Sequence, residues 1–60
     1  MDSRAVIKLL VADGWYFTKA SGSHYQFKHA GKPGKVTVKH PEKDIKPGTL
    51  ASIIKQAGLD

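Results

Sequence analysis

The chain has 60 residues, and its ten Lys and Arg residues against five Asp and Glu residues give a formal net charge of +5. A chain this short makes one small domain with a thin core. Such a core can hardly enclose the pocket of roughly 300 Å³ or more that small-molecule enzymes use. The positive charge favours instead an open face that binds a polyanion. The absence of cysteine excludes disulfides and thiolate metal sites, so a bound partner protein would help to stabilise such a core.

The first predicted element is an amphipathic helix that Ser3 caps and that runs to about Asp13, where Gly14 supplies a common stop. Its apolar residues follow helical spacing, with Leu9 beside them: Val6, Ile7, Leu10 and Val11. The N-terminal segment lacks the basic region and the unbroken apolar run of a signal peptide. No stretch of the chain approaches the run of about 18 consecutive apolar residues of a transmembrane helix. We therefore expect a soluble cytoplasmic protein that does not enter a membrane.

Three short strands are expected next. The aromatic, β-prone segment 15–19 precedes a turn of small residues at 20–23, and an alternating segment follows over 24–28. After a second turn at 30–34, residues 35–39 alternate strictly between polar and β-branched residues. These segments predict an antiparallel three-stranded sheet.

A second helix is expected from Pro47, which suits a first helical turn, to the terminating Gly58. Its apolar residues fall at i, i+3, i+4 and i+7: Leu50, Ile53, Ile54 and Ala57. The only linker-like stretch, 40–46, is too short to separate domains. The predicted fold class is therefore α+β, with the order α-β-β-β-α over a single domain of residues 1–60 and both helices on one face of the sheet.

Strand alternation assigns the side chains to two faces. The inner set that the helices would cover is Trp15, Phe17, Tyr25, Phe27, Val36 and Val38. The outward set on the second and third strands is His24, Gln26, Lys28, Thr37 and Lys39. Tyr16 is then the one aromatic residue of the strands that is left to stack on a nucleic-acid base.

The segment 14–41 contains no acidic residue and holds all three histidines and five of the ten basic residues. Within it His24 begins the second strand directly after Gly22 and Ser23, with its ring expected on the solvated face. RNA carries its own nucleophile, the 2′-hydroxyl, so a histidine that exchanges a proton, together with nearby cations, is sufficient for cleavage without a metal. The alternative is that His24 is an ordinary surface residue.

Neither a metal site nor a cofactor is expected. His29 would point to the face opposite His24, and two imidazoles without a carboxylate make a poor site. His40 ends the third strand, where it binds a phosphate, polarises the active site or is simply an exposed strand-end residue.

Three lysines are candidate phosphate contacts. Lys46 precedes Gly48 and Thr49 at the start of the second helix, where free backbone amides attract anions. Lys28 and Lys39 lie on the outward face of the strands. The alternatives are an ordinary helix start and a lysine-rich face that discourages aggregation.

Four segments of the chain form a pattern in this order: Asp13-Gly14-Trp15, Gly22-Ser23-His24, Val36-Thr37-Val38 with His40 after it, and residues 46–59, which read KPGTLASIIKQAGL. With these segments the chain resembles the HicA-type toxins, small mRNA interferases of the HicAB toxin-antitoxin systems, over nearly its whole length.

The resemblance implies a fold similar to a double-stranded-RNA-binding domain and a metal-independent endoribonuclease whose essential histidine corresponds to His24. It also implies mRNA as the substrate, RNA contacts at the Gly22-Ser23 turn, and neutralisation by a HicB-type antitoxin. A non-catalytic RNA-binding module of the same fold is the alternative. Direct DNA binding is disfavoured, because neither helix is a convincing basic recognition helix.

Overall fold

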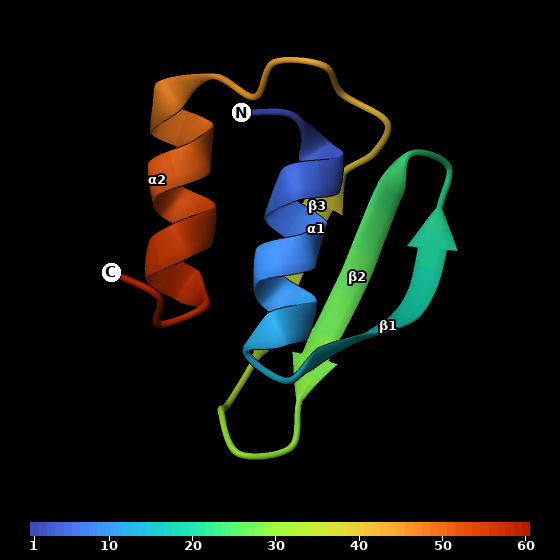
Figure 1. Ribbon diagram of the computed structural model, residues 1–60. Coiled ribbons are helices and arrows are strands. Elements are labelled where there is room, and N and C mark those ends of the chain that lie inside the picture. Colours follow the sequence, from blue (N-terminus) through green and yellow to red (C-terminus); the bar gives the residue numbers. More distant parts are fainter.

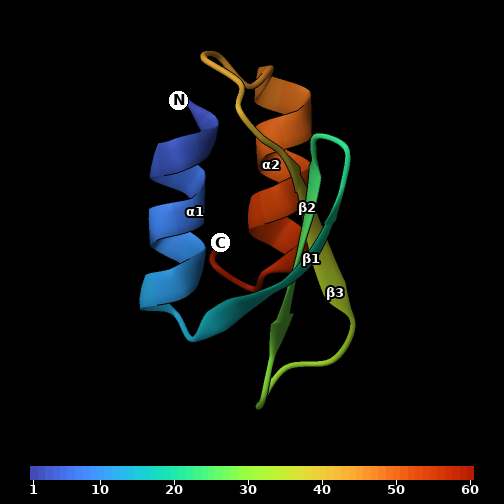
Figure 2. The same cartoon turned by 90° about the vertical axis from the view of Figure 1, so that its right-hand side faces the viewer.

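The computed structural model describes residues 1–60 and confirms the predicted fold class. The elements in chain order are α1 (Ser3–Ala12), β1 (Trp15–Ser21), β2 (His24–His29), β3 (Lys35–Lys39) and α2 (Pro47–Gln56). The strands form one antiparallel sheet in the order β1-β2-β3, with both helices packed on the same face (Figure 1). Seen from the side, the molecule has a helix layer and a sheet layer, and no helix covers the far face of the sheet (Figure 2). Neither helix is long and apolar enough to cross a membrane.

The core lies between the sheet and the helices. It contains nine buried apolar residues: Val6, Leu10, Trp15, Phe27, Val36, Val38, Ile45, Ile53 and Ala57. The strict alternation of β3 is confirmed, since Val36 and Val38 are fully buried while the lysines beside them are exposed. Ile45 was not expected in the core. It belongs to the stretch 40–46, which is therefore packed against the helices rather than loose.

The prediction that Phe17 is buried was wrong. Its ring lies on the inner side of the sheet, 5.4 Å from the ring of Tyr25 and 6.0 Å from that of Phe27, yet 51% of the residue is exposed. The reason is that β1 curves away from α1 as it approaches the β1–β2 turn, so no helix covers this part of the strand (Figure 1). Phe17 instead helps to line a shallow apolar groove beside α1 with Ile7 and Val11.

The prediction that Ser3 caps α1 was also wrong. The N-cap is Asp2, whose carboxylate accepts a hydrogen bond from the Ala5 backbone N–H at 2.8 Å. Ser3 is the first helical residue and is only 2% exposed, so its hydroxyl is directed into the protein rather than to the end of the helix.

Two strands are longer than predicted, and this shortens the turn between them. β1 runs to Ser21 and β2 begins at His24, so only Gly22 and Ser23 form the turn. Gly22 has φ of +59°, in the left-handed region that other residues reach at a cost. Glycine at the first of two turn positions is the pattern of type II′ hairpins, whose twist matches that of the flanking strands. His24, the residue directly after the turn, is therefore already paired in the sheet as the first residue of β2.

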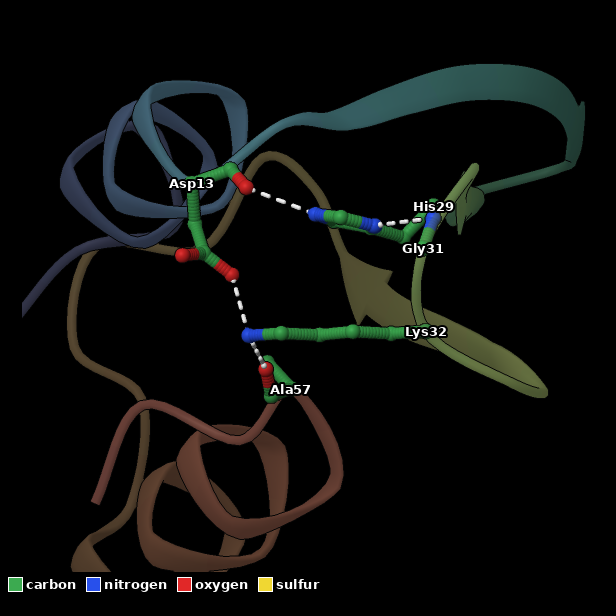
Figure 3. Close-up of polar contacts among 5 residues, drawn as sticks. All are labelled: Asp13, His29, Gly31, Lys32 and Ala57. Carbon is green, nitrogen blue, oxygen red and sulfur yellow. Dashed lines mark hydrogen bonds and ion pairs between the residues drawn. The ribbon is translucent and has the colours of Figure 1, made fainter.

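At the opposite end of the sheet, a group of polar contacts joins α1, the β2–β3 loop and α2 (Figure 3). Lys32 Nζ donates to Asp13 Oδ2 at 2.5 Å and to the Ala57 carbonyl at 2.9 Å. The Lys32 hydrogen bond, followed by its charge, holds the pKa of Asp13 below its ordinary value of 3.8, although partial burial opposes the shift. Lys32 thereby ties the carboxyl ends of both helices to the sheet.

Candidate functional site

The uncovered face of the sheet, which we call the outer face, is basic and contains no acidic residue. By strand register it consists of Tyr16, Lys19 and Ser21 on β1, His24, Gln26 and Lys28 on β2, and Lys35, Thr37 and Lys39 on β3. All of them except the half-buried Gln26 are exposed. Four lysines and one histidine on an open surface form a site suited to a long anionic chain rather than to an enclosed small molecule.

His24 lies on this face, as predicted, and is exposed. It is the first residue of β2 and lies opposite Ser21 on β1 and Lys39 on β3. Because opposed residues of antiparallel strands share a face, both neighbours lie beside the imidazole on the outer face. A ligand on this face can therefore touch the imidazole and a lysine ammonium together.

The candidate lysines differ in their distance from His24. Lys39 is directly opposite it across the β2–β3 ladder, whereas Lys28 lies four residues along β2, about 13 Å away at 3.3 Å per residue. Lys28 pairs instead with Lys35, at the far end of the same face. The outer face thus carries one positive group beside the imidazole and a like-charged pair at the other end of the strands.

Lys19 is a further member of the site that alternation along β1 does not find. The strand has an irregularity between Phe17 and Lys19, where Thr18 is the extra residue and donates its hydroxyl to the Gln26 carbonyl at 3.1 Å. Strict alternation from Trp15 would direct Lys19 inward, but after the bulge it lies opposite Gln26 and faces outward. The bulge therefore places a second lysine on the outer face, on the strand next to the one that carries His24.

Tyr16 is 52% exposed and lies opposite Lys28, so it is the one aromatic side chain on the outer face, as its position in the sequence predicted. The base of a bound strand could stack on this ring while the adjacent lysines contact phosphates. This places an apolar platform at the end of the face that is remote from His24.

The other predicted positions lie around the edge of the outer face. An added Cβ at Gly22 would meet nothing within 4 Å, so the surface of the turn is open beside His24. Lys46 is the N-cap of α2 and makes no side-chain capping bond. Its helix begins at the same end of the molecule as the turn, but in the helix layer rather than on the outer face (Figure 1).

His29 is turned to the opposite side of the sheet from His24, as predicted. Its Nδ1 accepts the Gly31 backbone N–H at 2.9 Å, which assigns the ring proton to Nε2 and a hydrogen bond to the Asp13 carbonyl at 2.7 Å (Figure 3). An added Cβ at Gly14 would lie 2.8 Å from this ring, so glycine is required there for packing as well as for its φ of +103°. His29 is a structural residue.

His40 is not the exposed strand-end residue that was one of its three predicted roles. It is half-buried, its Nδ1 lies 2.7 Å from Ser3 Oγ, and its ring packs edge-on against Tyr25 at 4.9 Å. The three histidines therefore lie in three separate environments. No group of three or more His, Cys, Asp and Glu side chains is placed to hold a metal ion.

Comparison with known proteins gives a consistent result. The family model described as "HicA toxin of bacterial toxin-antitoxin" matches residues 3–59. Among solved structures, a chain of the "HicA3 and HicB3 toxin-antitoxin complex" is 34% identical, with a TM-score of 0.84 over 100% of this chain and 97% of that one. Among curated proteins, none matches the chain.

Proposed function

Because the chain belongs to the HicA toxin family of bacterial toxin-antitoxin systems, we propose that it is an endoribonuclease that cleaves mRNA without a metal ion, with His24 as its single catalytic histidine. The observation that carries this proposal is the position of His24, which is exposed on an acid-free face beside Lys39 and close to Lys19. A proton-transfer group, positive charge and open access to a polymer are together what cleavage of RNA requires.

The reaction that fits these groups is attack by the 2′-oxygen of a ribose on its own 3′-phosphorus. His24 takes the 2′-hydroxyl proton as the new O–P bond forms, and the bond from phosphorus to the 5′-oxygen of the next nucleotide breaks. The departing oxygen receives a proton from the imidazolium or from water. The products are a 2′,3′-cyclic phosphate and a 5′-hydroxyl end, and water supplies no oxygen to either of them.

The lysines near the imidazole would stabilise the negative charge that accumulates on phosphorus. Lys39 is the nearest by register and Lys19 lies on the other flank, so the phosphate at the cleaved bond would lie between two cations. Lys28 and Lys46 would hold phosphates farther along the strand. Gly22 and Ser23 would contact the backbone of the RNA at the turn, where no side chain obstructs the approach.

A HicB-type antitoxin is proposed as the protein partner. The matched solved structure is a complex of HicA3 with HicB3, and the outer face of this chain is an uncovered basic surface that a partner could shield. Covering it would block RNA from His24 and from the lysines at once. Purified antitoxin should therefore stop cleavage when it saturates the toxin. It should also protect backbone amides of β1 and β3 from hydrogen exchange.

The proposal is tested by incubating the purified protein with single-stranded RNA, in buffer and in EDTA. Fragments should form at the same rate in both, and their ends should be 2′,3′-cyclic phosphate and 5′-hydroxyl. An RNA with a 2′-deoxyribose at the cleaved position should stay intact. Loss of activity in EDTA would show that a metal ion takes part, and binding without fragments would support the non-catalytic RNA-binding module instead.

The corresponding experiment in cells compares the wild-type chain with the His24→Ala variant in a strain without antitoxin. Wild type should arrest growth and deplete mRNA, whereas the variant should do neither at equal protein level. Growth arrest by the variant that equals that of wild type would refute the catalytic role of His24.

A further inference from the structure

His40 contacts both chain neighbours of His24, namely Ser23 in the turn and Tyr25 in β2. Its backbone N–H donates to the Ser23 carbonyl at 2.8 Å, which extends the β2–β3 pairing into the turn itself. Its ring lies against Tyr25, the residue that follows His24, with the ring centroids 4.9 Å apart and the planes at 76°. The position of His40 therefore affects the residues on both sides of the proposed catalytic histidine.

The ring of His40 is in turn fixed by Ser3. The Ser3 hydroxyl accepts the Glu42 backbone N–H at 2.8 Å, which leaves its own proton to be donated to Nδ1 of His40 at 2.7 Å. We assign the ring proton to Nε2 on this basis. The Ser3 backbone N–H also donates to the Glu42 carbonyl at 2.8 Å, so two hydrogen bonds join Ser3 to Glu42.

Burial makes this arrangement rigid. Ser3 is 2% exposed, so the hydroxyl has little access to water and would lose a buried hydrogen bond if His40 moved away. The Ser3–His40 bond also joins segments 37 residues apart in the sequence, the start of α1 and the end of β3. The turn is thus anchored through His40 to the helix layer.

We propose that His40 is a positioning residue for the cleavage reaction, and that the Ser3–His40 hydrogen bond holds the Gly22–Ser23 turn so that His24 is correctly placed for proton transfer. This inference rests on the proposed function of His24. It predicts a larger effect on the rate of the chemical step than on the affinity for RNA, because Lys39 is the one outer-face lysine next to His40 in the chain, and Lys19, Lys28 and Lys35 lie farther away along the strands.

The test compares two variants that break the bond with one that retains it. Ser3→Ala removes the hydroxyl, and His40→Phe keeps a ring against Tyr25 but has no Nδ1. Both should lower kcat about 10-fold to 100-fold, the size expected when a catalytic group is misplaced by about 1 Å, with KM within about threefold of wild type. His40→Asn, whose side-chain oxygen can accept the Ser3 proton, should recover most of kcat. The double variant Ser3→Ala/His40→Phe should lose no more than either single one.

Lys32→Met is the matched control for stability, because it breaks a clamp at the opposite end of the molecule. It should lower the midpoint of thermal unfolding and leave kcat unchanged at temperatures where all variants are folded. If Ser3→Ala and His40→Phe are destabilised in the same way but cleave with the wild-type kcat, the bond is only structural and the inference is wrong.

A second measurement separates this inference from the proposed function. Hydrogen exchange of the His40 backbone amide, which donates to the Ser23 carbonyl, should be about tenfold faster or more in Ser3→Ala than in wild type. An unchanged exchange rate would overturn the inference even if RNA is cleaved. Faster exchange in a protein that cleaves no RNA would uphold the coupling of Ser3 to the turn while the proposed function fails.

Discussion

The salt dependence of RNA binding tests whether the outer face holds the phosphate chain. Each phosphate that a protein contacts on a single strand contributes about −0.7 to the slope of log K against log salt concentration. Five lysines are proposed to hold phosphates, the four on the outer face and Lys46, so the slope should be about −3.5 and the affinity should fall about 130-fold between 50 and 200 mM salt. Lys19→Gln should reduce the slope to about −2.8 and the loss to about 50-fold, because one of these contacts is removed.

The assay is fluorescence anisotropy with a labelled single-stranded RNA, in a His24→Ala background so that the RNA stays intact. Lys55→Gln is the matched control, because Lys55 is in the last turn of α2, in the helix layer. It removes the same charge from the protein but should leave the slope unchanged. Equal reductions of the slope in the Lys19 and Lys55 variants would show that only net charge matters and would refute the assignment of RNA to the outer face.

Three further predictions concern stability. Gly22→Ala should cost about 1–2 kcal/mol in urea unfolding, because φ is +59° while nothing obstructs the new Cβ; an unchanged free energy of unfolding would contradict the turn geometry. The hydrogen bond from Lys32 lowers the pKa of Asp13, so the stabilisation that this ion pair gives the fold is present above about pH 4 and is lost as the pH falls through the lowered pKa. Asp13→Asn should therefore lose less stability than wild type as the pH falls. The same dependence of the free energy of unfolding on pH in both proteins would argue against the ion pair. Phe27→Ala should cost about 3–5 kcal/mol and Phe17→Ala only about 1 kcal/mol, since Phe27 is 2% and Phe17 51% exposed; equal losses would mean that Phe17 is covered in solution.

Much of the fold follows from local patterns in the sequence. The bounds of β3 and the first residue of α2 are as predicted, because strict alternation and a proline at a helix start are strong signals. The face of His24 also follows from alternation, since β2 has no irregularity. The hairpin turn is shorter than predicted because Ala20 and Ser21 pair with β2, and small residues alone do not reveal where pairing stops.

The features that sequence reasoning missed depend on contacts between distant residues. The sequence predicts Ser3 as a helix cap, but the partners of its hydroxyl are His40 and Glu42, and no local pattern shows a bond across such a separation. Lys19 reaches the outer face only because of the bulge in β1. Ile45 is a single apolar residue in a polar stretch, and only the closing of that stretch over the helices buries it.

The rate of RNA cleavage by the His24→Ala variant in a single turnover, measured beside its affinity for the same RNA, tests the central claim most directly. We predict that the rate falls by about 10²–10⁴, the usual contribution of a general acid or base, while the dissociation constant stays within about threefold of wild type. A variant that cleaves as fast as wild type would contradict the account, because the outer face would then hold RNA without its histidine taking part in the reaction.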